Sequence, residues 1–154
     1  MSEPQPLPGA VTISVLEAGD LEVVERIERA SFGSPWPRSS FEAALAQTHC
    51  LNLAARCAGN LVGYLVAILH PPTILIANVA VDRGFRRHQV GTQLLEYLFD
   101  QARSVGCDYS VLDVRPSNEG AIRLYEAIGF RPVGQRPGYY LDPPEDALTM
   151  ARLL

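Results

Sequence analysis

The feature that most constrains the fold is a run of three apolar segments in the first half of the chain, at residues 52–56, 61–69 and 74–81. Val, Ile, Leu and Ala dominate these segments. A strand with one wet face alternates apolar and polar residues, whereas a strand buried on both faces is apolar almost throughout. We therefore predict neighbouring strands that are covered on both faces. A hairpin turn joins the first two segments, with Gly59 and Asn60 at positions that tolerate positive φ.

Two helices are predicted ahead of these strands. Asp20 is placed to cap the first helix, whose apolar residues recur at helical spacing between Leu21 and Ser31. The segment Phe32–Pro37 contains two prolines and a glycine, which end this helix. Ser39 and Glu42 stand three residues apart in a capping-box pattern, which predicts a short second helix.

Two more helices are predicted after the apolar strands. Apolar residues form one helical stripe between about residues 90 and 105, and Gly106 ends this third helix. Asn118 or Ser117 caps the fourth helix, and Gly129 is placed to stop it.

The other ordered segments are predicted to be strands, at residues 12–16, 109–114, 131–136 and 147–153, with a turn-rich loop over 137–146. The element order is therefore β-α-α-β-β-β-α-β-α-β-β. Helices alternate with strands in the middle of the chain and strands pair at its end. This order predicts an α/β fold, with a mixed sheet of about seven strands and helices on both faces.

Composition favours a single globular domain. The chain has 154 residues, of which 47% are apolar and 19% charged, so residues 11–154 suffice for one domain after a Pro-rich, flexible arm at 1–10. No segment approaches the roughly 18 uninterrupted apolar residues of a membrane span. The N-terminus also lacks the basic start and apolar run of a signal peptide. We expect a cytoplasmic protein that does not bind membranes.

Charge and cysteine content exclude further classes. The formal net charge is −4, whereas nucleic-acid-binding domains usually carry a basic excess. This acidity is compatible with a cationic substrate. Cys50, Cys57 and Cys107 lack CxxC spacing, so neither a disulfide framework nor a metal site is predicted. The sequence does not indicate an oligomeric state.

A basic loop precedes the third predicted helix. Arg83, Arg86 and Arg87 concentrate positive charge there, and Gly91 permits a close approach to the backbone. The start of a helix has unpaired N–H groups and a partial positive charge, which together favour a pyrophosphate group. The alternative interpretation is a solvated, charged turn in front of an amphipathic helix.

A motif further along the chain favours the pyrophosphate-binding interpretation of this loop. Residues 118–130, Asn-Glu-Gly-Ala-Ile-Arg-Leu-Tyr-Glu-Ala-Ile-Gly-Phe, resemble a signature of the GNAT superfamily of N-acetyltransferases. In that superfamily a capped helix brings a tyrosine near the thioester sulfur and ends in Gly-Phe. Residues 86–91 are similar to its cofactor loop and residues 78–81 to the strand before that loop. The resemblance implies a GNAT fold and acetyl-CoA as co-substrate.

The resemblance extends to the RimI-type ribosomal-protein alanine N-acetyltransferases. Residues 30–41 look like their early substrate-side loop, and residues 112–118 are similar to their Leu-Glu-Val-Arg-x-Ser-Asn strand end. Residues 138–140 and 145–150 match their closing segments. The resemblance therefore covers the chain from Thr12 onward. It implies acetylation of the N-terminal alanine of a basic small-subunit ribosomal protein.

The resemblance also implies where acetyl-CoA binds. Backbone groups of Val79, Ala80 and Val81 hold the pantetheine arm like an added strand. The remaining cofactor residues are those of the loop and helix start, together with a residue of the downstream motif: Arg86, Arg87, His88, Gln89, Val90, Gly91, Thr92 and Asn118.

Gln89 departs from the superfamily's pattern, because it stands where the loop usually has its first glycine. If its φ is positive, the backbone is strained by roughly 1 kcal/mol or more. If its φ is negative, the side chain has only to point away from the cofactor. We expect acetyl-CoA binding to be retained.

Asp113 and Tyr125 are the candidate catalytic residues. Asp113 stands where the family's proton acceptor is a glutamate, so its reach is shorter by about 1.5 Å, a gap that one water bridges. Tyr125 is the candidate proton donor, since a phenol of pKa about 10 protonates a thiolate whose thiol has a pKa near 8.5. The alternatives are a strand-end residue that caps a turn for Asp113 and a core aromatic for Tyr125.

The pKa of the acceptor favours a protein N-terminus. An α-amino group has a pKa of about 7.8 and a lysine about 10.4, a difference worth roughly 3.5 kcal/mol of deprotonation. By resemblance, Trp36, Tyr139 and Tyr140 form the peptide groove, where tyrosines combine an apolar face with a hydroxyl. The alternatives are hairpin packing for the tyrosines and a plug over the core for Trp36.

Other functions stay open from the sequence alone. A basic peptide suits the acidic surface residues of the chain, namely Glu42, Asp142, Glu145 and Asp146. Scattered surface carboxylates are, however, usually only solvated. A small-molecule amine or an internal lysine is an alternative acceptor. The two departures, Gln89 and Asp113, also leave open an acetyl-CoA-binding module without catalytic activity.

Overall fold

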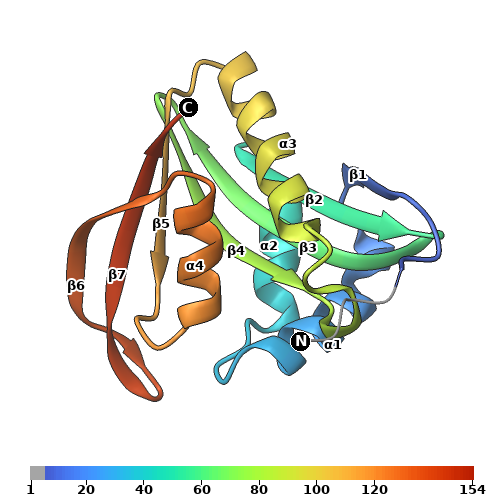
Figure 1. Cartoon of the computed structure of the whole chain (residues 1–154), viewed down its shortest axis with the longest axis horizontal. Coiled ribbons are helices and arrows are strands. Elements are labelled where there is room, and N and C mark those ends of the chain that lie inside the picture. The colour runs from blue at the N-terminus through green and yellow to red at the C-terminus, as the bar shows by residue number, and fades with distance from the viewer. Residues whose placement is uncertain (1–5) are drawn as a thin grey trace.

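The predicted strands form one seven-stranded mixed sheet in the computed structural model, which describes residues 6–154 (Figure 1). Neighbouring strands follow the order β1-β2-β3-β4-β5-β7-β6, in which β4 and β5 are parallel and the other neighbours antiparallel. The strands are β1 (Val11–Val15), β2 (Cys50–Cys57), β3 (Asn60–His70), β4 (Thr73–Val81), β5 (Tyr109–Val114), β6 (Arg131–Leu141) and β7 (Pro144–Leu153). The helices are α1 (Leu21–Ser31), α2 (Arg38–Ala46), α3 (Val90–Ser104) and α4 (Glu119–Ala127), with short 3-10 turns η1 (Ala18–Asp20) and η2 (Arg83–Phe85). The predicted fold class and element order are confirmed.

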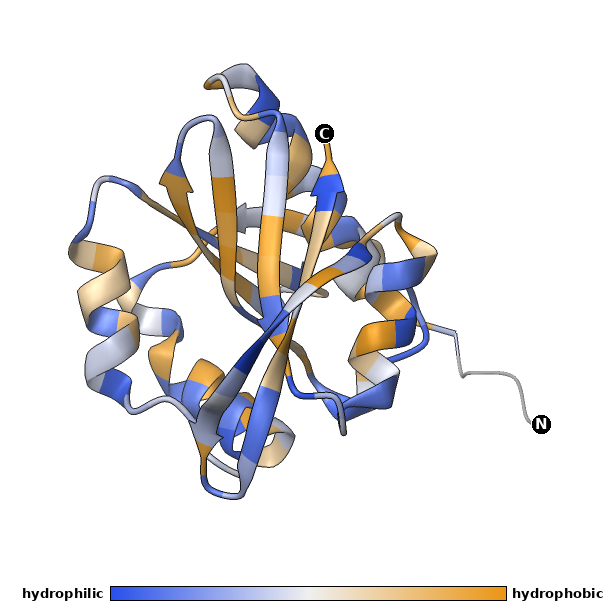
Figure 2. Ribbon diagram, turned by 90° about the vertical axis from the view of Figure 1, so that its left-hand side faces the viewer, coloured by the Kyte–Doolittle hydropathy of each residue, from blue (hydrophilic) through white to orange (hydrophobic). Residues whose placement is uncertain are grey.

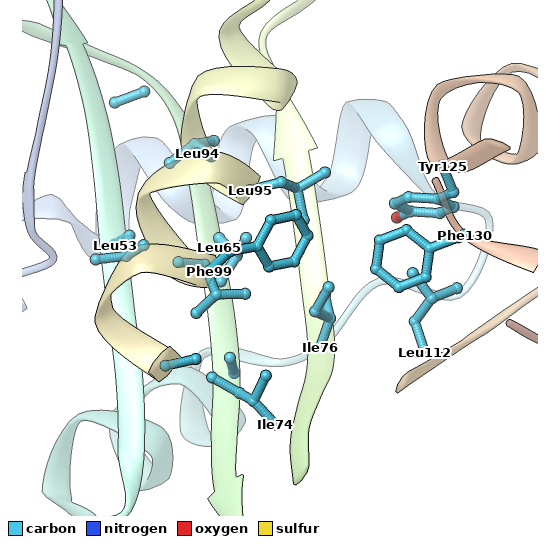
Figure 3. Packing of buried hydrophobic residues seen from close by; sticks show 14 of the residues in the cluster. Leu53, Leu65, Ile74, Ile76, Leu94, Leu95, Phe99, Leu112, Tyr125 and Phe130 are labelled. Atoms are coloured by element: carbon cyan, nitrogen blue, oxygen red, sulfur yellow. The ribbon is translucent and has the colours of Figure 1, made fainter. Parts of the chain in front are cut away.

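Helices flank the sheet on both sides, which explains the apolar character of its central strands (Figure 2). On one face, Phe99 of α3 packs in a buried cluster with Ile76 of β4 (Figure 3). On the other face, Ile27 of α1 and Phe41 of α2 form a second cluster that includes Tyr64 of β3. Removing apolar surface on both faces from water drives this layered packing.

The first two helices begin differently from the prediction. Asp20 precedes α1, but its carboxylate does not cap that helix. It accepts two hydrogen bonds from Arg56, at 2.9 and 2.8 Å, and one from the N–H of Glu17 at 2.8 Å. The bonds from Arg56 hold the pKa of Asp20 below its usual range, against the effect of burial. The predicted Ser39 capping box is also wrong, because α2 already begins at Arg38, directly after Pro37.

Both hairpins differ in detail from the prediction. The residues with positive φ in the β2–β3 turn are Ala58 and Gly59, not Asn60. The predicted loop over 137–146 is mostly strand, because β6 reaches Leu141 and β7 begins at Pro144. Pro137 is tolerated because β6 lies at the edge of the sheet, where a missing N–H interrupts fewer ladder bonds, and Pro144 is tolerated as the first residue of β7.

The parallel strands β4 and β5 separate halfway along their length, and this separation creates the site. Their ladder pairs Thr73–Ile76 with Tyr109–Leu112 and goes no further, although both strands continue (Figure 1). At the same level the register between β3 and β4 shifts, because Val66 pairs with Asn78 and Ala67 with Ile76. A bulge of this kind bends a strand and increases its twist. β4 therefore turns away from β5 beyond Ile76.

The predicted N-terminal arm is only partly within the described residues. Residues 1–5 lie outside them, and Leu7 packs against the cluster on the α3 side of the sheet. The Gly9 carbonyl accepts a hydrogen bond from the Cys57 thiol at 3.4 Å. Within residues 6–154, no helix is both long enough and apolar enough to cross a membrane.

Gly63 of β3 provides the first prediction. A Cβ at this position would lie 3.1 Å from the Ala80 carbonyl oxygen and 3.3 Å from Cγ1 of Val90, at the start of α3. Gly63→Ala is therefore expected to lower the free energy of unfolding by about 1 to 3 kcal/mol, as over-packing does. Urea denaturation measures this change. The control Gly19→Ala meets no atom within 4 Å and should stay within about 0.5 kcal/mol of wild type.

Candidate active site

Two adjoining cavities open where β4 and β5 separate. The first, here called the strand-end cavity, has a volume of about 370 Å³ and lies between Ile76–Val79 of β4 and Leu112–Arg115 at the end of β5. The second, called the loop cavity, has a volume of about 630 Å³ and lies between Val79–Val81, the loop before α3 and the start of α4. The two cavities share six lining residues: Ser31, Phe32, Val79, Asn118, Ala121 and Tyr125. Together they form a continuous passage past the separated strands.

Nearly all predicted cofactor residues line the loop cavity. They are Val79, Ala80, Val81, Arg86, Arg87, Gln89, Val90, Gly91, Thr92 and Asn118. His88 is half-buried on the same loop and lines neither cavity. Its neighbours Arg87 and Gln89 have left-handed backbone conformations, with φ of 65° and 61°.

The start of α3 faces the loop cavity with the donors that an anion needs. Gln89 is the N-cap, and the first intrahelical bond runs from the N–H of Gln93 to its carbonyl. Helices have unpaired N–H groups in their first turn, which here comprises Val90, Gly91 and Thr92. Arg123 of α4 also lines this cavity. The sequence analysis missed Arg123, although it lies five residues after the predicted cap Asn118.

Close packing of α3 on α4 gives the loop cavity its shape. A Cβ on Gly91 would lie 3.2 Å from Cδ2 of Leu124 and 3.9 Å from Cγ2 of Val81. Glycine at position 91 therefore lets the start of α3 approach both α4 and β4. This close approach brings the backbone at the start of α3 and the edge of β4 into one cavity.

The edge of β4 that faces β5 has no strand partner beyond Ile76 within residues 6–154. Its other edge pairs with β3, with Val79 opposite Leu65 and Ala80 opposite Tyr64. Arg86 donates from Nε to the Val81 carbonyl at 3.0 Å and from Nη2 to Ser31 Oγ at 3.2 Å. Apart from the Val81 carbonyl, which accepts from Arg86, this stretch of β4 is open to an extended chain that adds as a strand.

Tyr125 lies where the two cavities meet. It projects from α4, is 7% exposed and packs edge-on against Phe130, with ring centroids 5.7 Å apart. Figure 3 shows its hydroxyl oxygen on the side of the ring that faces the strand carrying Ile76. Burial, and secondarily the nearby Tyr140, raise the pKa of Tyr125 above its ordinary value. The phenol is therefore kept in its protonated form, as a proton donor requires.

Asp113 lines the strand-end cavity and is held by two donors from neighbouring strands. Thr149, its register partner on β7, donates from Oγ1 to Oδ1 at 2.6 Å. Arg136 of β6 places Nε 3.2 Å from Oδ1 and 3.1 Å from Oδ2. A carboxylate has about four acceptor sites, so it retains capacity for a further donor in the cavity.

Glu28 is a second carboxylate in the strand-end cavity, and the sequence analysis missed it. It is 1% exposed and accepts hydrogen bonds from the Tyr64 hydroxyl, from Asn78 Nδ2 at 2.9 Å and from the N–H of Trp36 at 2.9 Å. A buried carboxylate needs such donors, because its desolvation is otherwise costly. Its spacing in the sequence could have identified it, because Glu28 stands four residues after Val24 on the buried stripe of α1.

The predicted groove residues take different positions. Trp36 lines the strand-end cavity and also packs on Phe41, with ring centroids 5.2 Å apart, so it is both a cavity wall and a cover over the core. Tyr140 lines the same cavity, and burial raises its pKa to about 12. Tyr139 is 52% exposed and lines neither cavity. The two rings pack edge to face, and Tyr139 is the outer, more exposed of the pair.

Residues 21–130 match the family model described as the Acetyltransferase (GNAT) family. The chain belongs to this family. The predicted resemblance to GNAT enzymes is therefore confirmed, and with it the dependence on acetyl-CoA that is common to the family. Of the catalytic candidates, both Asp113 and Tyr125 lie in the passage between the separated strands.

Relatives with similar sequences narrow the resemblance to the RimI type. The [ribosomal protein bS18]-alanine N-acetyltransferase of Escherichia coli is 34% identical over 142 residues, covering 91% of this chain and 95% of that protein. The N-alpha-acetyltransferase RimI of Mycobacterium tuberculosis is 35% identical over 148 residues, covering 92% of each. The crystal structure of the Escherichia coli enzyme superposes with a TM-score of 0.85 over 94% of both chains, at 33% identity.

The described part of this GNAT enzyme contains no grouping of three or more His, Cys, Asp or Glu side chains that could hold a metal ion. None of the thiols at Cys50, Cys57 and Cys107 lines either cavity.

The left-handed backbone at Gln89 provides the second prediction. A non-glycine residue in this conformation costs about 1 kcal/mol, which glycine avoids. Gln89→Gly is therefore expected to raise the free energy of unfolding by about 0.5 to 1 kcal/mol, measured by urea denaturation. Gln101→Gly, in the regular part of α3, is the matched control and should lower that free energy by about 1 kcal/mol. A decrease for both variants would contradict the strain at Gln89.

Proposed function

We propose that this GNAT enzyme transfers the acetyl group of acetyl-CoA to the N-terminal α-amino group of a ribosomal protein. The small-subunit protein and its alanine are proposed from the names of the RimI-type relatives. The observation that carries the proposal is the meeting of the two cavities at Tyr125, with Asp113 in one cavity and the start of α3 in the other. Such a passage holds a donor and an acceptor at the same time.

The loop cavity fits acetyl-CoA. The N–H groups at the start of α3 and the guanidinium groups of Arg87 and Arg123 suit the phosphates, and the free edge of Val79–Val81 suits the amides of the pantetheine arm. The thioester then lies near Tyr125, where the strands separate. This placement leaves the strand-end cavity for the acceptor.

The reaction needs an unprotonated amine and a protonated leaving group. In our proposal Asp113 accepts a proton from the α-ammonium group, directly or through one water. The amine nitrogen attacks the thioester carbonyl carbon, and the C–S bond breaks as the C–N bond forms. Tyr125 gives its phenolic proton to the departing sulfur of coenzyme A, and the second proton lost by the attacking nitrogen restores the Tyr125 phenol, while the proton on Asp113 passes to solvent. No acyl-enzyme is needed, which agrees with the absence of the described cysteines from the two cavities.

The acceptor cavity suits the terminus of a chain. It is the smaller of the two cavities, at about 370 Å³, and is lined by two carboxylates, Glu28 and Asp113, that attract a cationic amine. An α-amino group gives up its proton more readily than a lysine, by about 2.6 pKa units. The proposed partner is a basic ribosomal N-terminus, without direct contact to nucleic acid. Ribosomal proteins are made in the cytoplasm, so the proposed location is cytoplasmic.

Acceptor choice is the third prediction. The purified protein is given acetyl-CoA and one of three acceptors: an Ala-starting basic peptide, the same peptide with a blocked N-terminus, or a polyamine. Mass spectrometry is expected to show one acetyl group on the N-terminus of the free peptide and none on the other two. The physical reason is the lower pKa of the α-amino group.

Two outcomes would contradict this proposal. Acetylation of lysines in the blocked peptide at a similar rate would indicate a lysine acetyltransferase. Binding of acetyl-CoA without turnover on any of the three acceptors would indicate a binding module. Asp113→Asn is the control for chemistry, because it removes the proposed proton acceptor and is expected to lower kcat about 100-fold.

The proton donor is the fourth prediction. Tyr125→Phe keeps the ring against Phe130 but removes the hydroxyl, and kcat is expected to fall about 100-fold or more. Because burial raises the pKa of Tyr125, the donor form persists in alkaline solution. The kcat of the wild type should therefore not decline between about pH 8 and 10, where an ordinary tyrosine begins to ionise. Tyr97→Phe, an exposed tyrosine on α3, is the matched control, and an equal kcat for Tyr125→Phe and wild type would contradict the role.

A further inference from the structure

Arg115 follows directly after β5, two residues beyond Asp113, and directs its guanidinium group to the β6–β7 hairpin. Nη1 donates to the Pro143 carbonyl at 2.9 Å, and Nη2 donates to the Asp142 carbonyl at 3.1 Å. Nη1 also lies 3.8 Å from Oε1 of Glu145. The forked shape of arginine allows one side chain to bind both carbonyls of the turn. Arg115 thus fixes the hairpin turn to the strand that carries Asp113.

The same guanidinium group covers Tyr140. Its central carbon lies 4.2 Å from the centroid of the Tyr140 ring, within the range of a cation–π contact. The Tyr139 ring packs edge to face against the Tyr140 ring, with the two centroids 5.0 Å apart. Tyr140 lines the strand-end cavity, so Arg115 holds one of its walls in position.

The Asp142 carbonyl also links the β6–β7 hairpin to the loop between α1 and α2. Ser34, in the loop between α1 and α2, donates a hydrogen bond from its hydroxyl to this carbonyl oxygen. One oxygen therefore accepts from the end of β5 and from the α1–α2 loop. Gly33 and Ser34 are exposed lining residues, which places this junction at the open end of the strand-end cavity. Arg115 does not line the loop cavity.

We infer that Arg115 is a positioning residue that sets the affinity for the acceptor chain beyond its first residue. The inference rests on the proposed function. The reacting amine lies at the inner end of the cavity beside Asp113 and Tyr125, so the following residues pass its open end. That end is bounded by the α1–α2 loop and the hairpin, the two segments joined at the Asp142 carbonyl. An acceptor of one residue does not reach them.

The test compares wild type with Arg115→Met, which keeps the length of the side chain and removes its charge and donors. Steady-state kinetics at saturating acetyl-CoA use an Ala-starting pentapeptide and alaninamide as acceptors. The KM for the pentapeptide is expected to rise about tenfold, as the loss of charge-assisted hydrogen bonds predicts. The kcat/KM for alaninamide should fall less than that for the pentapeptide, and the Kd for acetyl-CoA should stay near wild type because Arg115 does not line the loop cavity. Arg115→Lys should give an intermediate KM, because lysine keeps the charge without the fork.

Arg103→Met is the matched control, since Arg103 lies on α3 and lines neither cavity. Ser34→Ala removes the other donor to the Asp142 carbonyl and should raise the same KM in the same direction, which decides the matter if Arg115→Met does not fold. An unchanged KM for the pentapeptide in folded Arg115→Met, or equal losses for both acceptors, would overturn the inference. If the wild type itself fails to acetylate both acceptors while binding acetyl-CoA, the proposed function fails instead.

Discussion

The site depends on the point at which the ladder between β4 and β5 ends. Parallel strands normally stay paired, because an unpaired strand edge exposes N–H and C=O groups that need partners. Here the pairing stops at Ile76 and Leu112, and the bulge in β4 at the same level bends the strand away. The result is a sheet with an internal edge, open to an extended ligand. Asp113 follows directly after the last residue of β5 that pairs with β4, so one structural break produces both the slot and the position of the proposed proton acceptor.

The charged side chains around this slot come from α1, from β5 and the residue after it, and from β6. Glu28 comes from α1 and Asp113 from β5, and each accepts hydrogen bonds from side chains of nearby strands. Arg115 and Arg136 lie on the acceptor side and contact the β6–β7 hairpin or Asp113. A buried charge is tolerated where hydrogen bonds replace its water. The carboxylates therefore keep fixed orientations toward the strand-end cavity, which lowers the cost of positioning an amine.

Much of the architecture could be predicted from local patterns. The apolar character of 61–69 and 74–81 predicted strands covered on both faces, and Asn118 caps α4 as expected, with its side chain accepting from the N–H of Ala121 at 3.3 Å. Asp20 was predicted to act in the same way as Asn118 and does not, because Arg56, 36 residues away in sequence, binds its carboxylate. Local capping patterns fail where a distant charged side chain competes for the cap. The prediction of a loop over 137–146 was wrong for a related reason, since Pro137 lies on the edge strand β6, a position that only the sheet order identifies.

The sequence by itself determined the order of the elements, and the resemblance of its motifs to GNAT enzymes singled out the basic loop before α3 and the candidates Asp113 and Tyr125. These depend on residue type and short spacing, which are properties of neighbouring residues along the chain. Only the tertiary structure decided the sign of φ at Gln89, the burial of Glu28 among Tyr64, Asn78 and the N–H of Trp36, and the junction at the Asp142 carbonyl. The burial of Glu28 and the junction result from contacts between segments far apart in sequence, whose geometry is set by how the helices pack on the sheet, whereas the φ at Gln89 is a backbone angle that residue type alone does not fix.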